Sequence, residues 1–302
     1  MNIVSLVTLL SILLPAKTWF AADQPLAISI DSQAPLTLFL TDFSGKQIQG
    51  NAASEVQPAA TVDIKKIFPQ VAQPGTYLLY AVPQKEATLD KFVGTPLVIS
   101  VREDKRRNAP PGAMVTKIEP LVYATMTTDQ GDMIMAFYFD VAPNTSDNFI
   151  DLAKGGYFDG LTFHRIVPGF VIQGGDPRGD GTGGPGYQIG AEFSDRPHVE
   201  GTLSMARTGD PAEGGGTSPR PEFANSAGSQ FFICLDYNAT KQLDGKYTAF
   251  GKVVKGMEVY KAIGTTPADR VSGRPEEPVV IRKVEIKPVT AEMNPYVGLL
   301  DK

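Results

Sequence analysis

The segment that most constrains this chain is residues 163–176, which read FHRIVPGFVIQGGD. Apolar, β-branched residues on both sides of Pro168-Gly169 favour strands, and the Pro-Gly pair breaks the chain between them. The break predicts that Phe170 turns beside Arg165 and that the strand that follows carries Gln173 on the same face. Glycines then close the segment in a tight turn. A permanent cation, an aromatic ring and an amide are therefore expected side by side.

A second run, residues 229–234 (SQFFIC), supplies another amide, Gln230, and another ring, Phe232. Its apolar stretch is typical of a buried strand, so Cys234 is expected to be a small buried hydrophobe rather than a reactive thiol. This single cysteine forms no intramolecular disulfide, so an oxidising compartment is neither required nor excluded. Together the two runs are suited to holding an extended peptide at a proline.

The bond before a proline isomerises slowly, because rotation about an amide has a barrier of about 18–20 kcal/mol. A catalyst needs no covalent bond to its substrate. It must stabilise the twisted amide with a donor aimed at the prolyl nitrogen and with an apolar socket that fixes the ring. Arg165 suits the first task, since a guanidinium is always charged and its donors lie in one plane. An isolated arginine is more often a surface ion-pair residue, but the flanking residues here favour the functional interpretation.

The chain of 302 residues is long enough for two modest domains. After a leader of residues 1–22, residues 23–107 contain several strand-like stretches and a turn at 42–46, which predict a small all-β, sandwich-like domain of unknown role. The strand-like stretches are residues 26–30, 36–40, 76–82 and 97–101. Polar residues 47–58 are expected to form a loop, and residues 108–118 a Pro-rich linker.

The pattern changes in residues 119–290, which precede a C-terminal tail of residues 291–302. A hairpin is expected at 122–127 and 133–139 around a turn at 129–132, helices at 143–154 and 256–263, and a last strand at 279–286. Many antiparallel strands with two well-separated helices predict a closed antiparallel β-barrel with two capping helices. The expected fold class is therefore mainly β.

The two runs described first resemble those of the cyclophilin family of peptidyl-prolyl isomerases, and the resemblance covers residues 121 to about 288. It implies that Arg165 is the catalytic arginine and that Gln173 is the amide that positions the substrate. It also implies a socket for the proline ring and a groove for the residues before it. The socket residues would be Phe170, Val171, Phe232 and Leu243, and the groove residues Gln230, Ala206 and the main chain of Arg207.

Several positions depart from the family's pattern. Gln242 stands where many members carry a tryptophan linked to tight cyclosporin binding, so cyclosporin is expected to bind weakly. Tyr247 replaces a histidine, and its ring is expected to remain a wall of the site. Arg207 replaces an asparagine, so only its backbone role is carried over. Residues 208–227 are longer than the usual connection and are expected to form a loop at the rim of the groove.

The first residues are typical of an export signal. Residues 3–14 are apolar apart from serine and threonine. As a helix they would span about 18 Å, well short of the roughly 30 Å of a bilayer's hydrocarbon core. We therefore expect a signal peptide from Met1 to about Ala22, with Ala16 as the alternative end, and an exported protein that is periplasmic or secreted. The competing interpretation is an uncleaved hydrophobic helix that anchors the chain at a membrane.

Other functions find little support in the sequence. The net charge of −5 disfavours a nucleic-acid partner, because phosphate binding requires clustered Lys and Arg. His164 and His198 show no metal-ligand spacing, so no metal and no cofactor are expected; His164 is interpreted as a hydrogen-bonded core residue. Ser204 and Ser229 lack His–Asp partners in the pattern, which argues against a hydrolase.

The sequence thus predicts an enzyme that isomerises X–Pro bonds of exported proteins and assists their folding, without a cofactor or a covalent intermediate. Its expected partners are proline-containing unfolded or extended polypeptides. The alternative is a non-catalytic chaperone module that only holds such segments in the same groove. The client proteins and the residue preferred before proline stay open.

Overall fold

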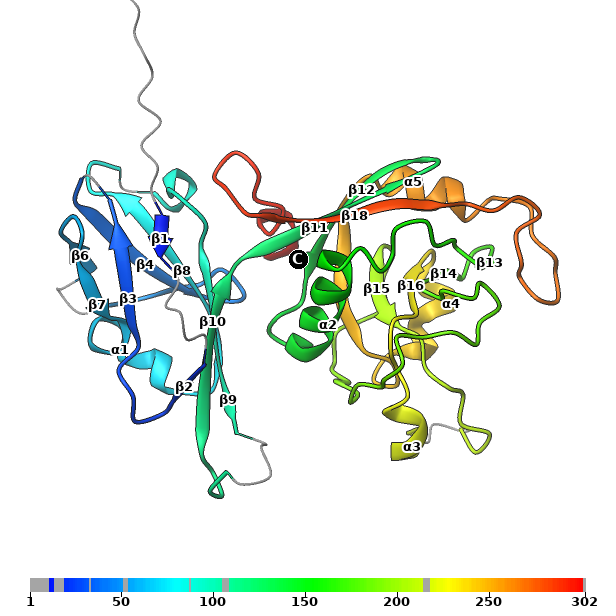
Figure 1. Ribbon diagram of the computed structural model, residues 1–302, viewed down its shortest axis with the longest axis horizontal. Coiled ribbons are helices and arrows are strands. Elements are labelled where there is room, and N and C mark those ends of the chain that lie inside the picture. The colour runs from blue at the N-terminus through cyan, green and yellow to red at the C-terminus, as the bar shows by residue number, and fades with distance from the viewer. Residues whose placement is uncertain are drawn as a thin grey trace, which may run out of the picture. The chain divides into compact units, whose positions relative to one another are not determined.

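The computed structural model of the chain, shown in Figure 1, describes residues 11–13, 19–32, 34–50, 54–86, 88–104, 109–213 and 218–300. The chain divides into two compact units. One comprises Met1–Val122 with Pro288–Lys302, and the other comprises Tyr123–Lys287. Strands dominate both units, which confirms the mainly β fold expected from the sequence.

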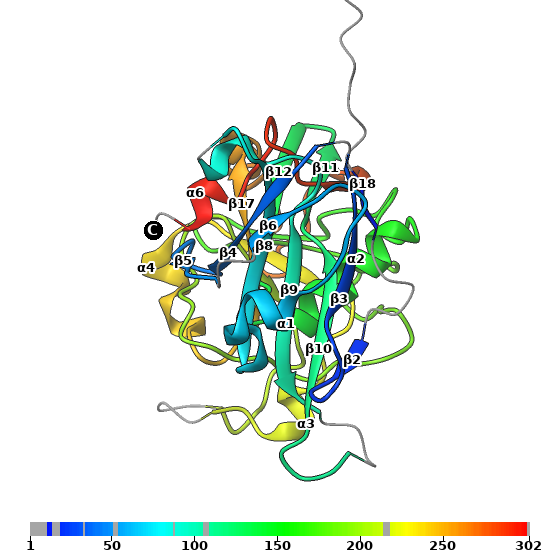
Figure 2. The ribbon, with the colours of Figure 1, turned by 90° about the vertical axis from the view of Figure 1, so that its left-hand side faces the viewer.

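The N-terminal unit contains two sheets within the described part of the chain. The larger has the order β2-β10-β9-β8-β4-β5, and β6 also pairs with β4. Its strands are β2 (Trp19–Ala21), β4 (Leu36–Asp42), β5 (Gln47–Ile48), β6 (Glu55–Val56), β8 (Gly75–Pro83), β9 (Leu97–Glu103) and β10 (Met114–Pro120). The smaller sheet joins β1 (Ser11–Leu13), β3 (Ala27–Asp31) and β7 (Thr61–Asp63). Figure 2 shows β8, β9 and β10 side by side.

Alternation along the strands builds one core for both sheets. Leu38 and Leu40 of β4 lie in the same hydrophobic cluster as Ile28 and Ile30 of β3. Successive side chains of a strand point to opposite faces, so every second residue reaches this core. Two short helices, α1 (Ile64–Ile67) and η2 (Pro69–Ala72), also contribute buried side chains to it. The sandwich arrangement itself remains a prediction.

The expected strands at 26–30, 36–40, 76–82 and 97–101 correspond to β3, β4, β8 and β9. The polar stretch expected as a loop carries two short strands, β5 and β6, because backbone pairing with β4 needs no apolar side chain. The segment expected as a linker overlaps β10, which begins at Met114 and pairs with β9 along its whole length.

The C-terminal residues return to the N-terminal unit. Tyr296, just before α6 (Val297–Leu300), is fully buried, and its hydroxyl donates to the carbonyl of Val122 at 2.7 Å. Its ring meets Phe43 edge-on, with 6.1 Å between ring centroids. The tail therefore packs against this unit.

The second unit contains one eight-stranded sheet of order β13-β14-β16-β15-β17-β12-β11-β18. The strands are β11 (Val122–Thr128), β12 (Gly131–Phe137), β13 (Arg165–Val167), β14 (Val171–Gly174), β15 (Thr202–Met205), β16 (Phe231–Cys234), β17 (Ala249–Lys255) and β18 (Ile281–Pro288). Backbone bonds join residues 160–163, just before β13, to residues 279–281 at the start of β18. Complete closure into a barrel remains a prediction.

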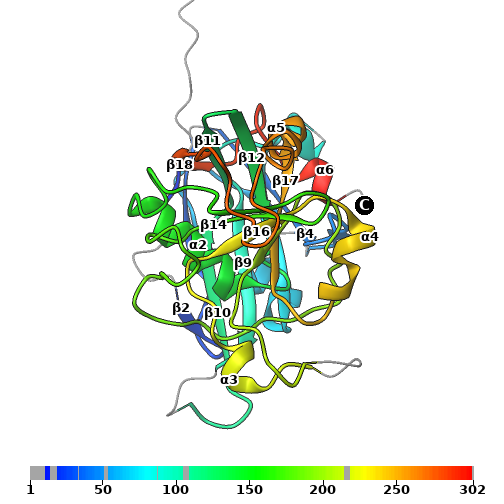
Figure 3. The same ribbon diagram turned by 90° about the vertical axis from the view of Figure 1, so that its right-hand side faces the viewer.

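Two helices of this unit match the predicted positions. They are α2 (Pro143–Lys154) and α5 (Met257–Ile263), both visible in Figure 3. The carboxylate of Glu192 accepts the first backbone N–H groups of α2, which would otherwise lack partners. On the buried face of α2, Phe149 packs among other buried aromatic rings. It stacks on Phe158 and meets Phe231 edge-on. This aromatic core supports the strands that carry the candidate site.

Candidate active site

Three neighbouring strands place the predicted residues in one row. Arg165 on β13 is the cross-strand partner of Gln173 on β14, and Gln173 is the partner of Phe232 on β16. Directly opposed residues of paired strands project from the same face. Between β13 and β14 the chain turns at Pro168-Gly169, where the positive φ of Gly169 (70°) suits a residue without a Cβ. The turn predicted from the sequence is confirmed.

Hydrogen bonds connect the polar members of this row. Arg165 Nη1 donates to Gln173 Oε1 at 3.4 Å, and Gln173 Nε2 donates to Gln230 Oε1 at 3.0 Å. The amide of Gln230 then donates to the carbonyls of Gly181 (3.0 Å) and Gly183 (2.8 Å). Each side chain is therefore held by the next, and the orientation of the guanidinium depends on the whole chain of bonds.

An apolar cluster lies beside the polar row. Val171, Phe232, Cys234 and Leu243 form its buried part, and Phe170, Ala206 and Tyr247 pack against it partly exposed. All the residues predicted for the socket are thus brought together, with Cys234 as an added member. Burial raises the pKa of the Cys234 thiol, which fits the inert role expected for it. A half-exposed apolar cluster of this kind is suited to receiving a small apolar ring.

A polar pocket of ≈ 470 Å³ adjoins the cluster, and its lining includes Gln173, Ala206, Arg207 and Gln230. One wall is the glycine-rich loop at residues 179–186. Its carbonyls accept from Gln230, and the buried carboxylate of Asp176 accepts the backbone N–H groups of Asp180 and Gly181. The loop is therefore held by Asp176 on one side and by Gln230 on the other.

The Arg207 and Tyr247 side chains lie in contact, which the sequence did not predict. The Arg207 guanidinium carbon lies 4.2 Å from the centroid of the Tyr247 ring. The ring in turn meets Phe232 edge-on, with 5.8 Å between centroids. Burial raises the pKa of the Tyr247 phenol, so the wall is an uncharged ring at neutral pH. Gln242, by contrast, is exposed, and its amide folds back to the carbonyl of Ala239.

The interpretation of His164 as a hydrogen-bonded core residue is only half right. The side chain is buried at 8% exposure, but neither ring nitrogen has a hydrogen-bond partner among the described residues. Its neighbour Arg165 points into the polar row instead. Alternation along the strand explains the difference, since successive side chains face opposite sides.

The statement that Ser204 lacks His–Asp partners is wrong. His198 Nε2 lies 3.0 Å from Ser204 Oγ, and His198 Nδ1 lies 2.9 Å from Asp244 Oδ1. The order resembles a hydrolase triad. However, Ser204 is fully buried and its hydroxyl donates to the carbonyl of Thr248 at 3.0 Å, so no substrate reaches it. The chain of bonds ties β15 to the turn that carries Leu243, and its role is structural.

Burial lowers the pKa of both His164 and His198, and the Asp244 contact only partly opposes this for His198. The folded state therefore binds fewer protons than the unfolded state below the ordinary histidine pKa of about 6.5. We expect the free energy of unfolding to fall as the pH drops from about 7.5 to about 5.5, by up to about 1.4 kcal/mol per pH unit and histidine. Urea unfolding at both pH values measures this. His198→Asn should weaken the pH dependence; an unchanged dependence in this variant and in His164→Asn would contradict the assignment.

Two absences hold within the part of the chain that the structure describes. No group of three or more His, Cys, Asp or Glu side chains is arranged to hold a metal ion there. No helix in those residues is long and apolar enough to cross a membrane.

Comparison with known proteins identifies the second unit. Residues 123–286 match the family model described as cyclophilin type peptidyl-prolyl cis-trans isomerase/CLD. A peptidyl-prolyl cis-trans isomerase of Synechococcus elongatus is 46% identical over 132 residues, covering 44% of this chain and 80% of the relative. The isomerase ppi1 of Schizosaccharomyces pombe is 43% identical over 164 residues, covering 52% of this chain and 94% of the relative.

A solved structure is also similar. The cyclophilin-type isomerase of Cryptosporidium parvum, crystallised in the presence of the dipeptide Ala-Pro, is 30% identical with a TM-score of 0.48 and covers 55% of this chain and 99% of that one. The family match spans more than half of the chain. The chain therefore belongs to the cyclophilin-type peptidyl-prolyl cis-trans isomerases, and its second unit is an enzyme domain of that type. The N-terminal unit, up to Val122, lies outside the match.

Proposed function

We propose that this chain isomerises X–Pro bonds of extended polypeptides, with Arg165 as the electrostatic catalyst. The observation that most supports this is the hydrogen-bonded row from Arg165 through Gln173 to Gln230, beside an apolar cluster. The row supplies an oriented cationic donor, and the cluster supplies a socket for a ring. The test is the rate of cis–trans exchange of a proline peptide with the wild-type chain and with Arg165→Ala.

The proposed mechanism follows from what rotation does to the amide. As the bond twists, resonance is lost and the lone pair localises on the prolyl nitrogen. With the ring held among Phe170, Phe232 and Leu243, an N–H group of Arg165 can donate to that lone pair in the transition state. The same group stabilises the planar ground state little, because the lone pair is delocalised there. Gln173 fixes the direction of the guanidinium. Rotation about the amide makes and breaks no covalent bond, so the step needs only donors that are already oriented. We therefore assign it neither a covalent intermediate nor a cofactor.

The substrate is proposed to extend from the socket into the adjoining polar pocket. Ala206 N donates to the carbonyl of Gln230 at 2.9 Å, so these two residues form a fixed edge between socket and pocket. Neutral amides, hydroxyls and backbone groups dominate the lining. Such a lining suits the main chain of an extended peptide. A module that binds proline segments without isomerising them would use the same groove, and only a rate measurement separates the two.

We propose that the chain is exported and that its leader ends at Ala16 rather than Ala22. Support comes from β2, which pairs with β10 in the N-terminal unit, and from Phe20, which is 8% exposed in the hydrophobic core. Lys65 Nζ also donates to the carbonyls of Ala22 (2.7 Å) and Gln24 (2.6 Å). Removal of residues 17–22 would discard β2, Phe20 and the Ala22 carbonyl, and would leave part of the β10 edge unpaired. Of the described strands, cleavage after Ala16 removes only β1, the edge strand of the smaller sheet.

N-terminal sequencing of the exported protein tests this choice. We expect Lys17 as the first residue, because cleavage there keeps β2 in the folded domain. A chain that begins at Asp23 would contradict the proposed end of the leader. A chain that keeps Met1 would contradict cleavage altogether and favour an uncleaved hydrophobic segment.

A further inference from the structure

Arg207 carries a buried cation next to the socket. Its side chain is 2% exposed, and its nitrogens are fully engaged by the surrounding protein. Nη2 donates to both carboxylate oxygens of Glu213, at 2.8 and 2.7 Å, while Nε donates to the carbonyl of Lys246 at 3.0 Å and Nη1 to that of Thr208 at 3.1 Å. Burying a charge is unfavourable unless it is paired and hydrogen-bonded. The arrangement satisfies both conditions, so Arg207 is held in one place.

The flat face of this guanidinium supports a wall of the socket. It lies over the Tyr247 ring at 4.2 Å, and Tyr247 contacts Phe232 in the apolar cluster. The Lys246 carbonyl that accepts from Arg207 belongs to the residue immediately before Tyr247. Arg207 therefore contacts both the ring and the backbone that carries it.

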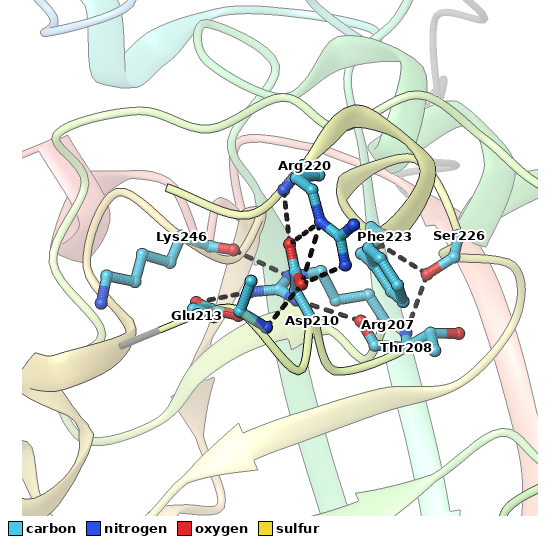
Figure 4. Close-up of polar contacts among 9 residues, drawn as sticks. Arg207, Thr208, Asp210, Glu213, Arg220, Phe223, Ser226 and Lys246 are labelled. Carbon is cyan, nitrogen blue, oxygen red and sulfur yellow. Dashed lines mark hydrogen bonds and ion pairs between the residues drawn. The ribbon is translucent and has the colours of Figure 1, made fainter. Parts of the chain in front are cut away.

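Glu213 belongs to the long loop between β15 and β16, and hydrogen bonds and an ion pair join the described residues on its two sides, as Figure 4 shows. Thr208 N donates to Ser226 Oγ at 2.8 Å, which joins the two ends. Inside, the Asp210 carboxylate is 1% exposed and accepts from Arg220 Nη2 at 2.8 Å and from Arg220 N at 2.9 Å. Arg220 holds the pKa of that carboxyl well below its usual range. Glu213 N then donates to the carbonyl of Asp210 at 2.9 Å, which fixes Glu213 relative to this ion pair.

We propose that Arg207 is a positioning residue for the isomerase site, and that its ion pair with Glu213 lets residues 208–213 and 218–226 of the loop set the place of the Tyr247 wall. The connection runs from the Asp210–Arg220 pair through Glu213 and Arg207 to Tyr247. This inference rests on the proposed isomerase function and deepens it. It assigns a role to the Arg207 side chain, whereas the family resemblance implied only a role for its main chain.

The residue type at position 207 is decisive in this arrangement. A guanidinium is planar, so one edge can donate to a carboxylate and a carbonyl while its face lies on an aromatic ring. A lysine ammonium would keep the positive charge next to Glu213 but would not cover the ring in the same way. Arg207→Lys therefore keeps the positive charge beside Glu213 but removes the flat surface that supports the Tyr247 ring. This variant tests the support of the ring separately from the charge.

Steady-state kinetics on a proline peptide test the proposal with three full-length variants. Glu213→Gln removes the loop's charge from the pair, and Arg207→Lys removes the flat face. We expect each to raise KM about tenfold, the scale of coupling between contacting residues, while kcat changes little because the wall contacts the ring in ground and transition states alike. The matched control is Glu258→Gln, which removes an exposed carboxylate from α5 of the same unit, outside this network, and should leave KM unchanged.

Ring signals of isotope-labelled Tyr247 in NMR spectra give a readout that does not depend on activity. They should move in Glu213→Gln and Arg207→Lys and stay in place in Glu258→Gln. Unchanged KM and unchanged Tyr247 signals in both test variants would overturn the proposal, even with a fully active wild type. An inactive wild type would instead overturn the proposed function. The Tyr247 signals would still show whether Arg207 and Glu213 hold the Tyr247 ring in place. If Glu213→Gln does not fold, Arg207→Lys alone decides.

Discussion

Arg165→Ala is expected to lower kcat/KM for a proline peptide by a factor on the order of 10²–10³, the usual effect of removing one preorganised donor from developing charge. The loss should fall on kcat, because the guanidinium is proposed to stabilise the twisted amide and not the planar one. Gln173 and Gln230 would remain in place, since they are bonded to each other and to the glycine-rich loop. A direct assay of cis–trans exchange measures the rate.

The matched control for this variant is Arg282→Ala. Arg282 is an arginine of the same unit, is 62% exposed and pairs with Asp129 on the surface. Its removal should leave kcat/KM unchanged, because an exposed ion pair contributes little. If Arg165→Ala isomerised the peptide as fast as Arg282→Ala, the catalytic role of Arg165 would be wrong.

Phe149→Ala is expected to lower the free energy of unfolding by about 3–5 kcal/mol, the range for truncating a large buried aromatic side chain. The ring is 1% exposed and lies 4.7 Å from Phe158 and 5.4 Å from Phe250, measured between ring centroids. Its loss would leave a cavity between α2 and the sheet that rigid neighbours fill only in part. Urea or thermal unfolding of the full-length chain measures the change.

Asp151→Ala on the same helix is the control for this stability prediction. Asp151 is exposed, and alanine favours a helix at least as well, so the free energy of unfolding should stay within about 0.5 kcal/mol of the wild type. If Phe149→Ala lowered the free energy of unfolding no more than Asp151→Ala does, the aromatic core would not be what holds the helix to the sheet.

The local parts of the site were predictable from the sequence. The turn at Pro168-Gly169 and the row of Arg165 and Gln173 depend on residues only a few positions apart, and strand alternation fixes which of them share a face. The helix at 143–154 was likewise predicted at its observed bounds, because proline at its start and glycine after its end mark the two termini. Short-range rules are enough where neighbours in the chain are neighbours in space.

The contacts across the fold were not predictable in this way. His198 and Asp244 are 46 residues apart, and nothing in the pattern indicates that they meet Ser204. Only a backbone role was expected for Arg207, because it replaces an asparagine of the family's pattern. Its partner Glu213 lies in an irregular loop, where no periodicity indicates a pairing. Such pairings depend on the path of the whole chain. The short strands β5 and β6 were not predicted for another reason, since two residues are too few to show an alternating pattern.

The most direct test of the central proposal is NMR exchange spectroscopy of a proline peptide mixed with the full-length chain. Without a catalyst, cis and trans forms exchange over roughly tens to hundreds of seconds, too slowly for exchange peaks. We predict exchange peaks between the two forms with the wild-type chain, and peptide binding without exchange peaks for Arg165→Ala. Shifted peptide signals with no exchange in the wild type would contradict catalysis and leave a module that only binds proline segments.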